Sequence, residues 1–141
     1  MPSVISYQKY LESFHIDDEL IPIKDALSKG SSMKKLHFLN VTTYEALMEI
    51  VKAKKELNKS ITCSIAPHYL YFSSVDVEPE STKFKCKPPL RDEKNQELLI
   101  SECLARGSVD IITSMHFPVA PELKEDLKDF SRAMPGANTI G

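Results

Sequence analysis

The sequence contains only three cysteines, and they stand far apart at Cys63, Cys86 and Cys103. No Cys-x-x-Cys pair occurs, so the spacing suggests neither a disulfide framework nor a zinc knuckle. Single, widely spaced cysteines are typical of buried, reduced thiols in a cytosolic protein. We therefore expect a cytoplasmic protein without structural disulfides.

Long hydrophobic runs and an excess of one charge are also missing. No stretch approaches the ~20 apolar residues of a membrane-spanning helix, and the first residues do not resemble a secretory signal. The net charge of −2 and the pI of about 6.1 give no electrostatic reason to expect nucleic acid or a membrane as a partner. With 141 residues, 42% hydrophobic and 27% charged, the chain is expected to be one soluble domain over residues 1–141.

Hydrophobic periodicity predicts alternating helices and strands. We expect helices over residues 6–14, 17–30, 42–57, 92–106 and 121–133, with Pro22 in a first turn and Leu104 facing inward. Strands are expected at 36–40, 61–65 and 109–116, the last one buried, with a weaker candidate at 84–86 that two prolines cut short. A strand, a helix and a second strand in this order form a βαβ unit, which implies parallel strands.

Three stretches in this order carry a resemblance to a known family. Residues 66–70 read Ala-Pro-His-Tyr-Leu, residues 87–91 read Lys-Pro-Pro-Leu-Arg, and residues 109–118 read Val-Asp-Ile-Ile-Thr-Ser-Met-His-Phe-Pro. With a later Pro-Gly loop, they resemble the late part of a dihydroorotase-like cyclic amidohydrolase. The resemblance implies an α/β fold, the parallel-strand half of a TIM-like (β/α)8 barrel, roughly strands five to eight. A complete barrel needs at least ~200 residues, more than the 141 available.

The resemblance also implies where metal ligands would stand. Asn40 matches the fifth-strand histidine, His68 matches the sixth-strand histidine, and Met115 matches the eighth-strand aspartate that shuttles a proton in the family. An amide oxygen is a weak zinc donor and a thioether has no proton to exchange. We therefore expect no catalytic residue, only His68 as a remnant metal ligand, and no cofactor. Alternatively, His68 is a hydrogen-bonded residue at the top of the barrel.

Substrate-binding positions follow from the same resemblance. His116 matches a histidine that helps to hold a substrate carboxylate, Lys87 replaces a substrate-binding asparagine, and Arg91 ends the Pro-Pro-Leu-Arg run. The backbone of Pro135 and Gly136 lies in the matching Pro-Gly loop. The alternative for Lys87 and Arg91 is that they are solvated charges beside a loop.

Three functions remain open from the sequence. The first is a catalytically inactive amidohydrolase-like protein that acts as a binding or scaffold partner, connected by the resemblance to pyrimidine metabolism. The second is a part of a zinc-dependent cyclic amide hydrolase that another chain completes, and the third is a binder of small carboxylates. A homo-oligomer or a protein that supplies the missing barrel half is the expected partner, because a half barrel leaves strand edges unpaired.

Overall fold

Three parallel strands form the sheet of the computed structural model, which describes residues 4–29, 35–57, 60–124 and 127–139. The strands β1 (Lys35–Phe38), β2 (Ser60–Ile65) and β3 (Ile111–Ile112) lie in the order β1-β2-β3. The pairs Phe38↔Cys63 and Ser64↔Ile111 fix their register, so all three strands end at the same edge of the sheet.

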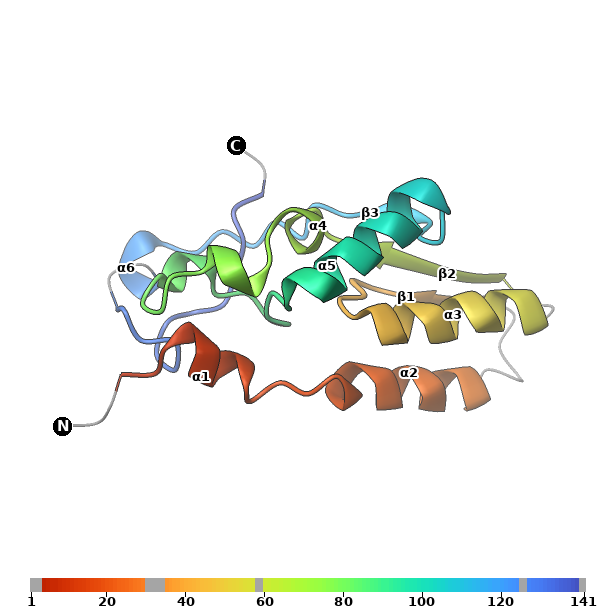
Figure 1. The fold of residues 1–141 in the computed structure, drawn as a ribbon, viewed down its shortest axis with the longest axis horizontal. Coiled ribbons are helices and arrows are strands. Elements are labelled where there is room, and N and C mark those ends of the chain that lie inside the picture. Colours follow the sequence, from red (N-terminus) through yellow and green to blue (C-terminus); the bar gives the residue numbers. More distant parts are fainter. Residues whose placement is uncertain (1–3, 30–34, 58–59, 125–126, 140–141) are drawn as a thin grey trace.

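Helix α3 (Tyr44–Glu56) provides the crossover between β1 and β2, as the βαβ pattern predicts. It begins after the extended residue Thr43 and buries Ala46, Leu47, Ile50 and Ala53. Helix α2 (Asp17–Lys29) packs beside α3, and Figure 1 shows the two helices lying along the strands. Pro22 lies in the second turn of α2, not in its first, and it is exposed.

The expected helix over residues 92–106 consists of two parts. Helix α5 (Glu93–Ile100) begins at Asp92, whose side chain accepts a hydrogen bond from the backbone N–H of Asn95. It continues as a π-helical turn, η4 (Ser101–Ala105), in which Glu102 is buried and accepts from Arg106 and Ser108. The wider turn changes which side chains face inward. Leu104 is consequently 73% exposed, so its expected inward position is wrong.

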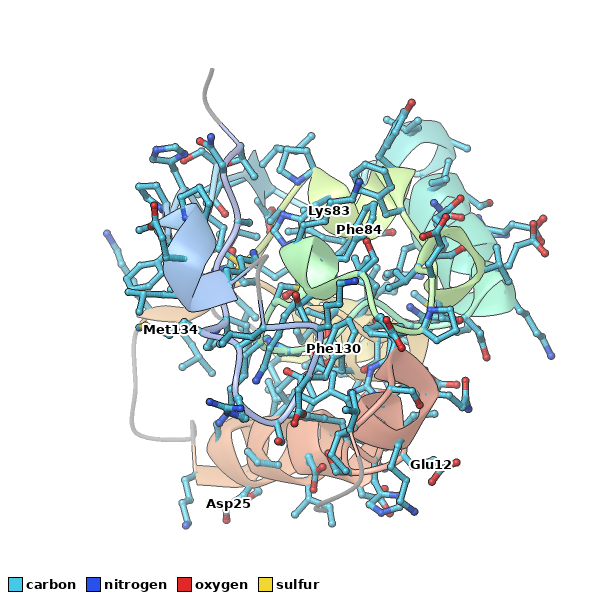
Figure 2. All side chains as sticks on the ribbon, turned by 90° about the vertical axis from the view of Figure 1, so that its left-hand side faces the viewer. Glu12, Asp25, Lys83, Phe84, Phe130 and Met134 are labelled. Atoms are coloured by element: carbon cyan, nitrogen blue, oxygen red, sulfur yellow. The ribbon has the colours of Figure 1, made fainter. Side chains whose placement is uncertain are left out.

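The N-terminal helix forms hydrogen bonds to the segment that precedes α5. In α1 (Tyr7–Leu11), the Tyr7 hydroxyl donates to the Leu90 carbonyl at 2.6 Å and the Tyr10 hydroxyl donates to the Cys86 carbonyl at 2.9 Å. Phe130 packs edge-on against the Tyr7 ring, 5.1 Å between centroids, and is fully buried. Figure 2 shows Phe130 well inside the molecule, whereas Glu12 and Asp25 lie at its surface.

The strand candidate at residues 84–86 is not a strand. A 3-10 turn, η3 (Thr82–Phe84), ends there, and residues 85–91 run without a ladder partner among the described residues. Pro88 and Pro89 have no N–H to donate to a neighbouring strand. In the part of the chain that the structure describes, the sheet therefore has three strands instead of the expected four, and β3 pairs directly with β2.

Two other expectations at the C-terminal end are wrong. Strand β3 is short, and Ile111 and Ile112 are 48% and 59% exposed where a buried strand was expected. Within the described residues β3 has only β2 as a neighbouring strand, so its other edge is not covered by a strand. Helix α6 (Pro121–Lys124) begins where a helix over 121–133 was expected; residues 125–126 lie outside the described residues, and residues 127–133 are not helical. Backbone groups beyond it bond to other segments: the Phe130 N–H donates to the Ile5 carbonyl, and the Ala137 carbonyl accepts from the Phe117 N–H.

Short helices α4 (His68–Tyr71) and η2 (Ser74–Asp76) complete the chain between β2 and η3. The parallel strands with helical crossovers confirm the expected α/β architecture of a partial barrel. None of the helices in the described part of the chain is both long and apolar enough to cross a membrane. That residues 1–141 form one independent domain stays a prediction.

Candidate functional site at the carboxyl ends of the strands

The three positions that the resemblance assigns to metal ligands lie beyond the ends of the three strands. Asn40 follows β1, His68 follows β2 and Met115 follows β3. Asn40 and Met115 both have a left-handed backbone, with φ of 54° and 47°. The Asn40 amide oxygen accepts a hydrogen bond from the Thr113 hydroxyl at 2.7 Å, and its backbone N–H donates to Ser64 Oγ at 3.0 Å. These bonds hold the turn after β1 against the other two strands.

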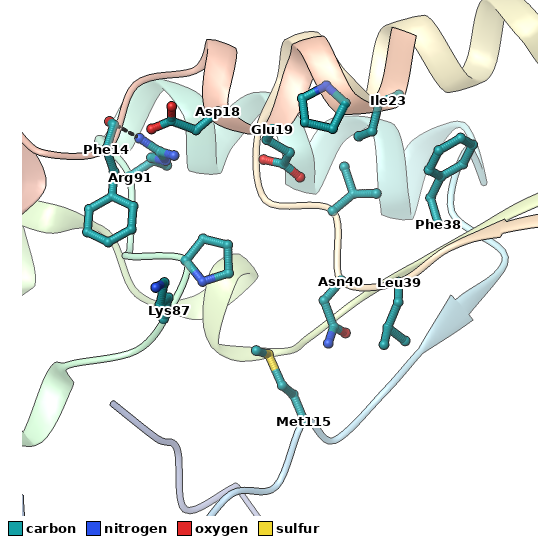
Figure 3. Close-up of a pocket in the computed structure, with 13 residues that line it drawn as sticks. Phe14, Asp18, Glu19, Ile23, Phe38, Leu39, Asn40, Lys87, Arg91 and Met115 are labelled. Carbon is teal, nitrogen blue, oxygen red and sulfur yellow. Dashed lines mark hydrogen bonds between the residues drawn. The ribbon is translucent and has the colours of Figure 1, made fainter. Parts of the chain in front are cut away.

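Two of the hollows at this edge of the sheet are lined by Met115. The first has a volume of about 480 Å³ and lies between α2, the end of β1 and residues 87–91, as Figure 3 shows. The second has a volume of about 180 Å³. Lys87 and Met115 line both hollows, and the full lining of the second is His68, Cys86, Lys87, Met115, Phe117, Pro135, Gly136 and Ala137. The structure thus brings five of the predicted positions to one small cavity.

His68 is the most unusual of these side chains. It is 9% exposed, and neither ring nitrogen has a hydrogen-bond partner within the described residues. Burial, with the charge of Lys124 adding to it, lowers the pKa of His68 to about 4, so the ring is neutral at pH 7. The hydrogen-bond partner that the alternative expectation gives His68 is not found among the described residues, and the role of His68 stays a prediction. A buried polar group without a partner is costly, which makes His68 a candidate ligand-binding group.

The predicted substrate-binding cations are placed differently from one another. Arg91 lines the first hollow and donates through Nη1 to the Phe14 carbonyl at 2.7 Å, while its Nε is buried without a partner among the described residues. Lys87 is exposed at the border of the two hollows. His116 lines neither hollow, and its Nδ1 accepts the backbone N–H of Thr139 at 3.2 Å. Their roles in binding stay predictions.

The Pro-Gly loop closes the second hollow from one side. Gly136 donates its N–H to the Lys85 carbonyl at 3.0 Å. A Cβ atom at this position would lie 2.5 Å from the Phe117 carbonyl oxygen and 2.6 Å from Val119 Cγ2. Contacts that short do not occur between non-bonded atoms, so the close approach of the loop to Phe117 requires glycine here.

Glu19 is a site residue that the sequence did not indicate. It lines the first hollow, and its carboxylate accepts both the backbone N–H of Thr42 at 2.7 Å and the Thr42 hydroxyl at 2.8 Å. Burial raises the pKa of Glu19 above its ordinary value, although the bonds from Thr42 oppose that shift. In the sequence, Glu19 is one of three acidic residues at a helix N-terminus. Stabilisation by the helix dipole explains all three equally well, so nothing in the sequence distinguishes Glu19 from the other two.

The residues that the structure describes do not include a group of three or more His, Cys, Asp or Glu that could hold a metal ion. At the strand ends, Asn40 and Met115 accompany His68 instead. A catalytic zinc site uses about three protein ligands of the imidazole, carboxylate or thiolate type. The set formed by Asn40, His68 and Met115 therefore does not fit a catalytic zinc ion.

Known proteins are similar to this chain over most of its length. No family model matches the chain. Allantoinase from Arabidopsis thaliana is 38% identical over 127 residues, which cover 84% of this chain and 25% of that protein. Allantoinase from Streptomyces avermitilis is 34% identical over 135 residues, covering 95% of this chain and 29% of that protein. These relatives of the chain are cyclic amidohydrolases.

Solved cyclic amidohydrolases show the same arrangement of elements. L-hydantoinase (dihydropyrimidinase) from Arthrobacter aurescens superposes with a TM-score of 0.85 at 27% identity, over 93% of this chain and 29% of that one. D-hydantoinase from Thermus sp. superposes with a TM-score of 0.81 at 19% identity, over 95% of this chain and 30% of that one, which supports the fold alone. The chain thus spans between a quarter and a third of these relatives, and the expected partial TIM-like barrel is confirmed.

Two expectations need correction against these relatives. The resemblance to cyclic amidohydrolases is confirmed at the level of the amidohydrolase superfamily, but the relatives are allantoinases and hydantoinases, and dihydroorotase is a different member. A connection to pyrimidine metabolism does not follow from them. The expectation that no cofactor is involved is wrong, because allantoinases and hydantoinases are metal-dependent amidohydrolases.

Proposed function

We propose that this chain is a part of a cyclic-amidohydrolase barrel that binds a small cyclic amide or a protein partner without hydrolysing an amide bond itself. The observation that carries the proposal is Met115, whose side chain lines both hollows at the strand ends. By resemblance, this is the position of the aspartate that moves a proton during hydrolysis. A thioether neither accepts nor releases a proton in water, so Met115 cannot take that part.

The neighbouring histidines do not replace the lost carboxylate. His68 has a pKa of about 4 because it is buried, so it is a weak base at pH 7. His116 lies outside both hollows, and the backbone N–H of Thr139 occupies its Nδ1. General base catalysis near neutral pH therefore lacks a suitable group among these side chains.

Binding is nevertheless supported by the second hollow. A neutral imidazole offers one N–H donor and one acceptor nitrogen, and both nitrogens of His68 are without a partner in the described structure. One of these nitrogens can form a hydrogen bond with the N–H or with the C=O group of a cyclic amide or ureide. Allantoin and hydantoin, the compounds for which the relatives are named, contain such groups.

A second candidate is that the chain contributes to a hydrolase completed by the other strands of the barrel. The observation in its favour is the length of the match, since the chain spans only 25% of the Arabidopsis allantoinase and 29% of the L-hydantoinase. Met115 would still be present in such an assembly. The hydrolytic candidate therefore needs a proton-transfer group other than Met115, His68 and His116.

The test combines an activity assay and a binding assay on the purified protein with added zinc. We expect no hydrolysis of allantoin, hydantoin or dihydroorotate, and we expect at least one of these compounds to raise the melting temperature. Ligand at ~100 times its Kd stabilises a protein by about 2.7 kcal/mol. Turnover that disappears in the His68→Ala variant would overturn the proposal and support the hydrolase. Lys9→Ala, on the exposed side of α1, is the matched control.

A further inference from the structure

The second hollow is lined by a combination of metal-binding groups that differs from that of a catalytic zinc site. Its lining includes the imidazole of His68, the thiol of Cys86 and the thioether of Met115. These side chains come from the start of α4, from the segment before α5 and from the turn after β3. We propose that the second hollow binds one soft monovalent metal ion, Cu(I), through His68, Cys86 and Met115.

His68 provides an observation that is independent of the two sulfur atoms. His68 is 9% exposed, it lines the hollow, and neither ring nitrogen has a partner within the described residues. An unpaired buried polar group costs about 1–3 kcal/mol. A bound ion would give one nitrogen a partner.

The chemistry of the donors selects the kind of ion. Thiolate and thioether sulfur are soft ligands that favour Cu(I), whereas zinc sites use imidazole, carboxylate and thiolate but not thioether. The resemblance places a carboxylate where this chain has Met115, so the substitution exchanges a hard donor for a soft one. Cys86 is 5% exposed and His68 is 9% exposed, so an ion held by them would be largely shielded from water.

Charge favours a monovalent ion over a divalent one. Cys86 binds as the thiolate, so its thiol proton leaves to solvent when the ion enters, and the copper keeps its oxidation state. One Cu(I), one thiolate and two neutral ligands sum to zero charge. A zinc ion on the same ligands would leave a buried positive charge near Lys87, and an uncompensated buried charge is costly.

The experiment is a competition between the purified full chain and a coloured Cu(I) chelator under anaerobic, reducing conditions. We expect one ion per chain, no displacement by equimolar zinc, and at least a tenfold loss of affinity in Met115→Leu and in His68→Gln. Met115→Leu nearly conserves volume, so it separates the loss of sulfur from a loss of packing. Met48→Leu on α3 and Cys103→Ser on η4, both outside the hollow, should retain full affinity.

Copper X-ray absorption gives a second measurement that does not depend on a Cys86 variant, which could fail to fold because Cys86 is buried. We expect two sulfur ligands in the wild-type protein and one in Met115→Leu. The proposal is overturned if the chelator removes all copper from the wild-type protein. It is also overturned if Met115→Leu and His68→Gln bind as tightly as wild type, or if Cys103→Ser abolishes binding, which would indicate adventitious capture by the half-buried thiol of Cys103.

Discussion

The hydroxyl of Thr113 donates a hydrogen bond to the amide oxygen of Asn40 over 2.7 Å, and this bond joins the turn after β1 to the end of β3. The two strands are not neighbours, since β2 lies between them. Asn40 also donates its backbone N–H to Ser64 near the end of β2. Asn40 thus fixes the relative positions of the three strand ends through its side chain and its backbone. The candidate site lies at these strand ends.

Removing this hydroxyl should destabilise the fold. In Thr113→Val the Asn40 amide oxygen loses its partner in a half-buried place, and the expected cost is about 1 kcal/mol. Urea unfolding at neutral pH measures the change. Thr62→Val is the control, because the Thr62 hydroxyl contacts the exposed ring of His37 and should contribute less. Equal losses in the two variants would contradict a special role for the bond to Asn40.

The local features of the fold could be predicted from the sequence, and the features that depend on distant neighbours could not. Asp92 as a helix cap and Gly107 with φ of +61° follow from residues that are close in the chain. The exposure of Ile111 and Ile112 depends on which segments cover β3, and periodicity contains no such information. Glu19 was missed because its partner Thr42 lies 23 residues away.

Part of the candidate site could also be predicted from the sequence. His68, Lys87, Met115, Pro135 and Gly136 were singled out by resemblance, and all five line the second hollow. Cys86 was not, because a lone cysteine before two prolines matches no metal-binding pattern. Its place beside His68 and Met115 results from tertiary contacts, among them the bond from the Tyr10 hydroxyl to its carbonyl.

Acid should weaken the contact between α3, β2 and the segment before β3. Burial alone would raise the pKa of Asp110, but bonds from Lys54 Nζ at 2.5 Å and from the Cys63 N–H at 2.7 Å hold it below its ordinary value. A carboxyl group whose pKa is lowered by folding contributes stability above its unfolded pKa of ~3.9, and that stability is lost as pH falls through the folded value.

The measurement is the free energy of unfolding between about pH 2 and pH 6. We expect the wild-type protein to lose stability below about pH 4, and Asp110→Asn to lose less over the same interval. Asp25→Asn, which removes an exposed pair with Lys29 on α2, is the control and should follow the wild-type curve. Identical acid slopes in the wild-type protein and Asp110→Asn would show that Asp110 does not contribute.

The positions after the strands should become a hard-metal site when the donors are changed. Asn40→His combined with Met115→Asp places two histidines and one carboxylate around the same strand ends, a set that suits zinc. We expect zinc affinity, measured by competition with a chelator, to rise at least tenfold over the wild-type protein. Each single variant should give a smaller gain. An unchanged affinity in the double variant would mean that the three side chains do not converge.

The edge of β3 that faces away from β2 has no ladder partner among the described residues, and it should mediate association with another polypeptide. Ile111 and Ile112 point to opposite faces of the strand and are 48% and 59% exposed, although parallel sheets are normally covered on both faces. An exposed apolar edge strand tends to pair with a further strand. A second copy could provide that strand through its β1 edge, since all strands here are parallel, and a chain with the other barrel strands could do the same.

Sedimentation at micromolar concentration tests this association. We expect a dimer or a complex with a co-purifying protein, and we expect Ile111→Lys with Ile112→Lys to shift the protein to the 15.9 kDa monomer. A charge on the edge opposes pairing with another strand, so the double variant should remain folded while it dissociates. Val75→Lys, at a 71% exposed position on η2, controls for added charge and should leave the assembly intact. A wild-type protein that sediments as a monomer and binds no hydrophobic dye would show that β3 is already covered.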